Sequence, residues 1–96
     1  MNEVNFKNWM IALGKNKKVT SDTVSRLKRI EKEIGPCDID NEYQKDRCEK
    51  LLELFYKNGD NEAMKSYKTS LPVGKYHMST YRLAIRQYVK FCDEVS

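Results

Sequence analysis

Apolar residues recur every three or four positions along much of the chain, which is the spacing of one face of an α-helix. The first such segment predicts a helix from about Asn2 to Leu13, because Gly14 is a residue that often follows a helix. The residues expected on its buried side are Val4, Phe6, Trp9, Met10 and Leu13.

The second periodic segment predicts a helix that ends at about Ile34. Thr20 or Ser21 is expected to cap its start, since a hydroxyl can accept a hydrogen bond from a free N–H of the first turn. Gly35 and Pro36 are expected to end it. The residues expected on its buried face are Val24, Leu27, Ile30 and Ile34.

The middle of the chain predicts one long helix from about Asn41 to Lys57, with Asp40 or Asn41 as its cap. The residues expected on its buried side are Tyr43, Arg47, Cys48, Leu51, Leu52, Leu54 and Phe55. A short helix around Met64 and Tyr67 is possible, and residues 69–78 are expected to form a loop that contains a proline and a glycine.

The last helix is predicted over "STYRLAIRQYVKF", with Ser79 as its cap. The residues expected on its buried side are Tyr81, Ala84, Ile85, Tyr88, Val89 and Cys92, with Phe91 at the edge. Arg82, Arg86 and Lys90 follow one another at intervals of four on the other side. Residues 1–96 are therefore expected to form one all-α domain, a bundle of four to five helices.

Composition excludes several classes of function. No stretch approaches the roughly 18 apolar residues of a membrane span, so no membrane partner is expected. The three cysteines include no CxxC pair, which favours reduced thiols in a cytoplasmic protein. With His77 as the single histidine, the chain offers neither a zinc ligand set nor a convincing catalytic pair. We expect no metal, no cofactor and no catalytic activity in this chain by itself.

Charge is segregated along the chain. Residues 1–35 and residues 64–96 each carry a net charge of +4, and residues 36–63 carry −4. This distribution favours a polyanionic partner. Arginine and lysine side chains on two helices and a loop could contact phosphates, and Ser79 could add a hydroxyl at a helix start. The candidate DNA-binding residues are Lys15, Lys17, Lys18, Ser25, Lys28, Arg29, Lys32, Ser79, Arg82, Arg86 and Lys90.

The order of "FKNWM", "TSDTVSRLKRIEK", "DID", "LLELF" and "STYRLAIRQYVKFC" resembles the N-terminal core-binding (SAM-like) domain of the tyrosine recombinase, or phage integrase, family. That resemblance implies a helical bundle that holds double-stranded DNA while a separate C-terminal domain performs catalysis. By position, the helix start at Thr20–Thr23, followed by Arg26 and Arg29, resembles the segment that faces DNA in that family. The last helix, with Arg82 and Arg86, resembles the family's last helix before the catalytic domain. The segment from Asn58 to Met78 is longer than the family's usual link.

Two alternatives remain open. The last helix is also similar to one in helical domains that precede the nuclease domain of some restriction endonucleases. The chain could instead be a protein-interaction or assembly module whose acidic middle segment binds a basic surface of a partner, with the basic helix faces simply solvated. One continuous face of Lys17, Lys28, Arg29, Arg82 and Arg86 would favour DNA, and scattered charges beside an exposed apolar patch would favour a protein partner.

Overall fold

A computed structural model describes residues 1–34, 38–56 and 75–95, with the side chains of residues 75–77 left out. These residues contain five α-helices: α1 (Glu3–Ala12), α2 (Lys17–Glu33), α3 (Ile39–Asp46), α4 (Glu49–Glu53) and α6 (Lys75–Val95). The prediction of an all-α bundle is confirmed for this part of the chain. The short helix expected around Met64 lies outside it. No helix in these ranges is both long and apolar enough to cross a membrane.

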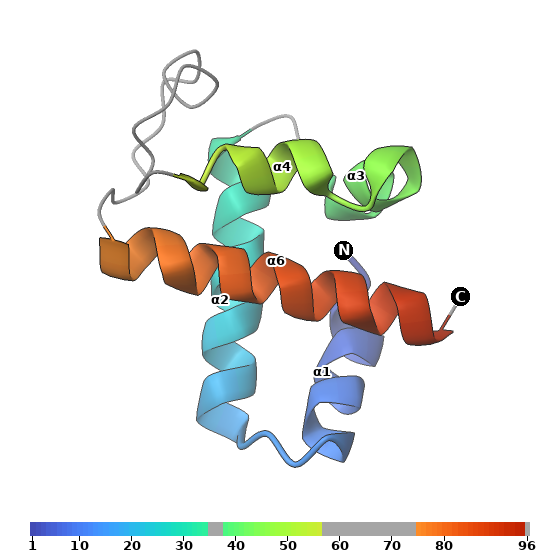
Figure 1. The fold of residues 1–96 in the computed structure, drawn as a ribbon. Helices are drawn as coiled ribbons and strands as arrows, with labels where there is room; N and C mark the ends of the chain where they lie inside the picture. Colours follow the sequence, from blue (N-terminus) through green and yellow to red (C-terminus); the bar gives the residue numbers. More distant parts are fainter. Residues whose placement is uncertain (35–37, 57–74, 96) are drawn as a thin grey trace.

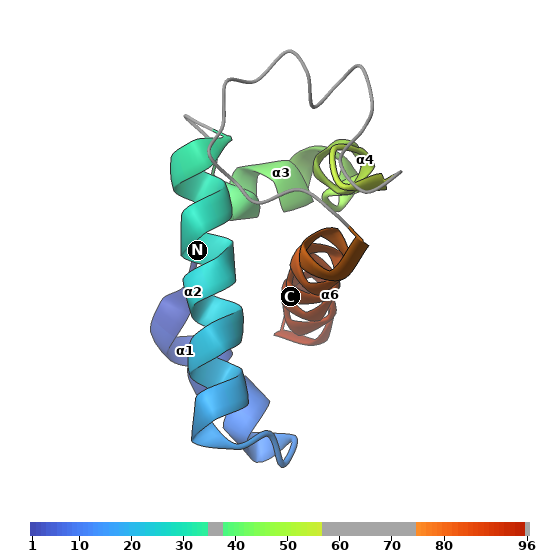
Figure 2. The same ribbon diagram turned by 90° about the vertical axis from the view of Figure 1, so that its left-hand side faces the viewer.

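The helices form two layers that share one core. Helices α1 and α2 run antiparallel beside each other, and α6 crosses α2 steeply in front of them (Figure 1). Turning the molecule shows α2 on one side and α6 on the other, with α4 above α6 (Figure 2). Phe6, Leu27, Ile85 and Tyr88 are fully buried between these layers. The Phe6 ring lies 5.1 Å from that of Tyr88 and 5.5 Å from that of Phe91.

Helix α1 agrees with the predicted range to within one residue at each end, but its buried side is narrower than expected. Phe6 and Met10 are buried, whereas Val4 is 67% exposed and Leu13 is 47% exposed. The prediction for Val4 and Leu13 was therefore wrong. At about 100° per residue, Val4 lies nearly opposite Phe6, and Leu13 lies beyond the last helical turn.

The cap of helix α2 lies four or five residues earlier than predicted. The side chain of Asn16 accepts a hydrogen bond from the Val19 N–H at 2.8 Å and caps the helix. The expected caps, Thr20 and Ser21, lie inside the helix, so that prediction was wrong. Thr20 is instead buried on the core side. The four predicted core residues are confirmed: Val24, Leu27, Ile30 and Ile34 are all buried.

The single helix predicted for residues 41–57 is in fact two helices. Asp38, rather than Asp40 or Asn41, caps α3 and accepts from the Asp40 N–H at 3.0 Å. Arg47 and Cys48 then adopt left-handed backbone angles, with φ values of 55° and 65°, and break the helix. Cys48 is buried as predicted, but Arg47 is exposed. The break turns α4 so that Phe55 enters the core.

Helix α6 begins at Lys75, four residues before the predicted cap. Ser79 therefore lies within the helix, and the loop prediction was wrong for residues 75–78. Met78 is fully buried, so packing in the core stabilises this additional turn. The predicted buried residues Tyr81, Ala84, Ile85 and Tyr88 are confirmed, and Phe91, expected at the edge, is also buried. The other two predicted residues, Val89 and Cys92, are half-buried.

Candidate functional site

The side of α2 that faces away from the core is basic. Val24, Leu27 and Ile30 are buried on the opposite side, which leaves the lysines of the helix and Arg29 in solvent. Together with the connection from α1, these residues form a surface that we call the α2 basic face. Its members are all exposed: Lys15, Lys17, Lys18, Ser25, Lys28, Arg29 and Lys32.

Two lysines of the α2 basic face are paired with carboxylates. The Lys28 ammonium lies 2.5 Å from a Glu3 oxygen, and its hydrogen bond is the main reason why the pKa of Glu3 is lowered. The Lys18 ammonium lies 3.8 Å from Asp22. Lys17, Arg29 and Lys32 form no ion pair with any residue that the structure describes. These three cations are therefore available for an external anion.

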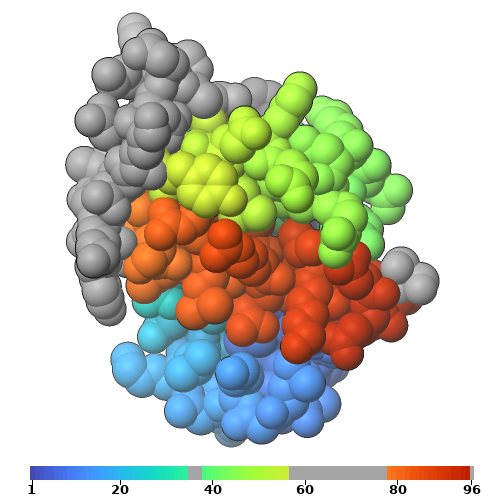
Figure 3. All heavy atoms as spheres, in the orientation of Figure 1, coloured from blue at the N-terminus to red at the C-terminus, as the bar shows by residue number. Residues whose placement is uncertain are grey.

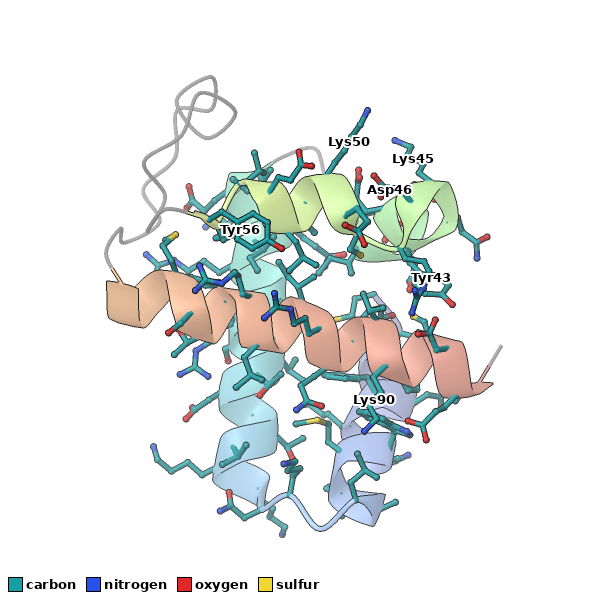
Figure 4. The ribbon with its side chains drawn as sticks, viewed as in Figure 1. Tyr43, Lys45, Asp46, Lys50, Tyr56 and Lys90 are labelled. Carbon is teal, nitrogen blue, oxygen red and sulfur yellow. The ribbon has the colours of Figure 1, made fainter. Side chains whose placement is uncertain are left out.

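Three of the cations of α6, together with Leu83, form a second surface, which we call the α6 strip: Arg82, Leu83, Arg86 and Lys90. Arg86 and Lys90 are exposed and form no ion pair within the described ranges. Figure 4 shows Lys90 on α6 and Tyr56 beside the amino-terminal half of that helix. Ser79 is exposed too, but the free N–H groups of the helix start belong to the turn before it. The backbone donors expected at Ser79 for a phosphate are thus absent.

Arg82 differs from Arg86 and Lys90, the other cations of the α6 strip, because it has partners within the described part of the fold. It is half-buried, and its guanidinium donates a hydrogen bond to the carbonyl oxygen of Phe55. The same guanidinium lies 5.8 Å from the centre of the Tyr56 ring, where a cation and an aromatic face attract each other. Arg82 therefore connects α6 to the chain just after α4.

The two basic surfaces do not combine into one face. Helices α2 and α6 pack against each other through their buried sides, so their exposed sides point away from the shared core in different directions (Figure 2). Lys28 and Arg29 lie on one of these sides, and Arg86 and Lys90 lie on the other. The described residues therefore do not form the single continuous basic face, shared by α2 and α6, that would have favoured DNA.

A polar cluster that sequence reasoning missed holds the start of the chain in place. The ammonium of Met1 lies 3.2 to 3.4 Å from carboxylate oxygens of Glu31, Asp38 and Asp40. Burial alone would lower the pKa of this ammonium, but its hydrogen bonds and the neighbouring negative charges raise it. Because the three carboxylates come from α2, α3 and the residue before α3, no spacing in the sequence identified them.

The hydroxyl of Tyr88 joins this cluster. It donates to Asp40 at 2.6 Å and accepts from the Asn2 N–H at 2.7 Å, and burial raises its pKa. A shallow hollow of about 250 Å³ lies beside it, lined in part by Tyr43, Phe91 and Cys92. Burial also raises the pKa of the Cys92 thiol to about 11, so this thiol is protonated and unreactive near neutral pH. The cluster is therefore best explained by its structural role.

No protein-family model matches the chain, and no curated protein or solved structure gives a significant match. The resemblance to the core-binding domain of tyrosine recombinases and the SAM-like assignment therefore stay predictions. The functional argument rests on the two basic surfaces.

Proposed function

We propose that the protein is a non-catalytic domain that binds double-stranded DNA through the α2 basic face. The observation that carries the proposal is the set of exposed cations on one side of α2. Lys17, Arg29 and Lys32 have no ion pair within the described residues, and the opposite side of the helix is anchored in the core. A rigid helix with its cations already exposed can contact phosphates without rearrangement.

The length of this surface suits a nucleic acid backbone. Lys18 and Lys32 are separated by about 21 Å along the helix axis at 1.5 Å per residue. Each strand of B-DNA carries a phosphate about every 3.4 Å of helix axis, so the same distance spans about six phosphates per strand. The arginine can hold a phosphate with two hydrogen bonds, and the lysines contribute point charges. Several phosphates can thus be contacted at once.

Any sequence preference would come from the middle of α2. Ser25, Lys28 and Arg29 are exposed near one another on the helix and could reach base edges in the major groove. In this proposal, catalysis belongs to another domain, as in a tyrosine recombinase or, as the alternative, in a restriction endonuclease. Lys28 would first have to exchange its partner Glu3 for the DNA.

The experiment is fluorescence anisotropy with a labelled random-sequence duplex at several salt concentrations. We expect affinity to fall steeply with salt, because phosphate contacts release counterions. The double variant Arg29→Ala/Lys32→Ala should bind about 60-fold more weakly at about 0.1 M salt, and its salt slope should fall by about 2, since it loses two phosphate contacts.

The matched control is Arg86→Ala/Lys90→Ala, which also loses two exposed cations but from the α6 strip. We expect its affinity to change by less than about threefold, an effect of net charge alone. Absence of duplex binding by the unmodified protein at low salt would disprove the proposal. Equal losses in the two double variants would show that affinity follows net charge and not the α2 basic face.

A further inference from the structure

The α6 strip contains exposed apolar and aromatic surface next to its cations. Leu83 is 57% exposed, and Tyr56, which follows α4, is 42% exposed. Arg86 lies one helical turn from Leu83, so the two side chains are neighbours on the surface. Figure 3 shows α6 as a continuous band across this face, between α4 and the layer of α1 and α2. Tyrosine and arginine are among the residues that are enriched in protein interfaces, and Leu83 adds apolar area beside them.

Part of this surface is held in place before any partner arrives. The guanidinium of Arg82 donates to the Phe55 carbonyl and lies over the Tyr56 ring, which restricts both side chains. Ordering side chains at an interface costs about 0.5 to 1.5 kcal/mol for each long side chain that is immobilised. The surface formed by Arg82 and Tyr56 avoids part of that cost.

The charges select the kind of partner. Arg86 and Lys90 have no ion pair within the described residues, so the strip attracts carboxylates or phosphates. Helix α4, on the other side of Tyr56, carries the exposed carboxylates Glu49 and Glu53 with one exposed lysine, Lys50, between them, so its net charge is negative. A duplex lying across both helices would meet these negative charges, and its phosphates would leave Leu83 without an apolar contact. A narrow peptide segment avoids both problems.

We infer that the α6 strip and Tyr56 form a docking surface for an acidic segment of a partner protein, one that carries an aliphatic or aromatic side chain among its carboxylates. The carboxylates would pair with Arg86 and Lys90, and the apolar side chain would cover Leu83 and the exposed part of the Tyr56 ring. This surface is separate from the α2 basic face, so the inference does not depend on DNA binding.

The test uses a display library of random peptides selected on the unmodified protein. Peptides that are enriched are then synthesised, and their affinities are measured by fluorescence anisotropy. Arg86→Glu and Leu83→Ser alter the docking surface, and Arg29→Glu makes the same charge change as Arg86→Glu on the other side of the molecule. All three positions are exposed, and thermal unfolding of each variant verifies that it is folded.

We expect enriched peptides with a net negative charge and at least one large apolar residue. These peptides should bind Arg86→Glu and Leu83→Ser about tenfold more weakly than the unmodified protein, the usual loss for an interface residue of moderate importance. Their affinity for Arg29→Glu should stay within about twofold of that for the unmodified protein. Failure to enrich acidic peptides, or an equal loss in Arg29→Glu, would overturn the inference. The inference would also be overturned if Arg86→Glu weakened duplex DNA binding as much as Arg29→Glu, because the α6 strip would then be a surface that contacts DNA.

Discussion

The exposed sides of α2 and α6 carry similar positive charge in different surroundings. From Ser21 to Glu33, α2 exposes no large apolar side chain, and its cations lie among hydroxyl groups and carboxylates. The α6 strip has its cations beside Leu83 and Tyr56, both more than 40% exposed. Two basic surfaces can therefore suit different partners, because phosphates need only cations whereas a protein interface also needs apolar contact.

The arginines of the two surfaces also differ in their contacts within the fold. Substitution of Arg82 is therefore expected to have the largest effect on stability. Arg82 makes a hydrogen bond to the Phe55 carbonyl and lies over Tyr56. Arg82→Ala removes both contacts and leaves a partly buried carbonyl without this donor. We expect the free energy of unfolding to fall by about 2 kcal/mol, the usual value for a hydrogen bond to a charged group plus a cation–π contact.

Urea denaturation measures this loss, and Arg86→Ala and Arg29→Ala are the matched controls. Both controls remove an exposed arginine without a described partner, so each should change stability by less than about 0.5 kcal/mol. If Arg82→Ala were as stable as the two controls, Arg82 would be an ordinary surface cation. Arg82 and Arg86 would then not differ in their contribution to stability.

Helical periodicity predicted the core of α2 and α6 well, because each buries one regular face over many turns. Val24, Leu27 and Ile30, for example, recur at intervals of three residues and are all buried. Periodicity failed in the middle of the chain. The left-handed residues Arg47 and Cys48 end α3, and Arg47 pairs with Asp93, which is 46 residues away in the sequence. No local pattern contains that partner.

The candidate site shows the same limit. Spacing along each helix correctly placed Lys28, Arg29, Arg86 and Lys90 in solvent. It did not identify the tertiary contacts of Arg82, since the Phe55 carbonyl reaches α6 only after α4 has packed. Nor did it predict that α2 and α6 would turn their cations to different sides. That outcome depends on which helix faces meet in the core. Periodicity identifies the apolar face of each helix but does not indicate which other face packs against it.

An added cation should act differently on the two surfaces. Ser25 is exposed in the middle of the α2 basic face, so Ser25→Lys adds a cation where DNA is proposed to lie. We expect duplex affinity to rise about eightfold at about 0.1 M salt, the value of one additional phosphate contact. Fluorescence anisotropy over a salt series measures both the affinity and the slope.

Gln87→Lys is the control for this gain, because it adds the same charge to α6 at a partly exposed position. We expect duplex affinity to stay within about twofold of the unmodified protein, with no change in the salt slope. An equal gain from Gln87→Lys would contradict the assignment of DNA to α2. A gain from neither variant would indicate that the duplex lies away from the middle of both helices.

The smallest expected effect concerns the acidic end of α6. Asp93 accepts hydrogen bonds from Arg47 and, at 2.6 Å, from the Tyr43 hydroxyl, and the Arg47 contact is the main reason why its pKa is lowered. Because the folded-state pKa lies below the ordinary value of about 3.9, the ionised carboxylate stabilises the fold above that pH. This contribution is lost as the pH falls through the lowered pKa.

Asp93→Asn should therefore be less stable than the unmodified protein near neutral pH, and the difference should shrink between about pH 5 and about pH 2. Urea midpoints over that range measure it, with Asp22→Asn as a control from the α2 side. A difference that does not change with pH would show that the carboxylate's charge contributes nothing at this position. A stability difference that shrinks as the pH falls would show that the ionised Asp93 carboxylate stabilises the fold, as expected from its contacts at the α3–α4 junction. The carboxylate would then offset little of the positive charge on the α6 strip, which keeps Arg86 and Lys90 available to an acidic partner.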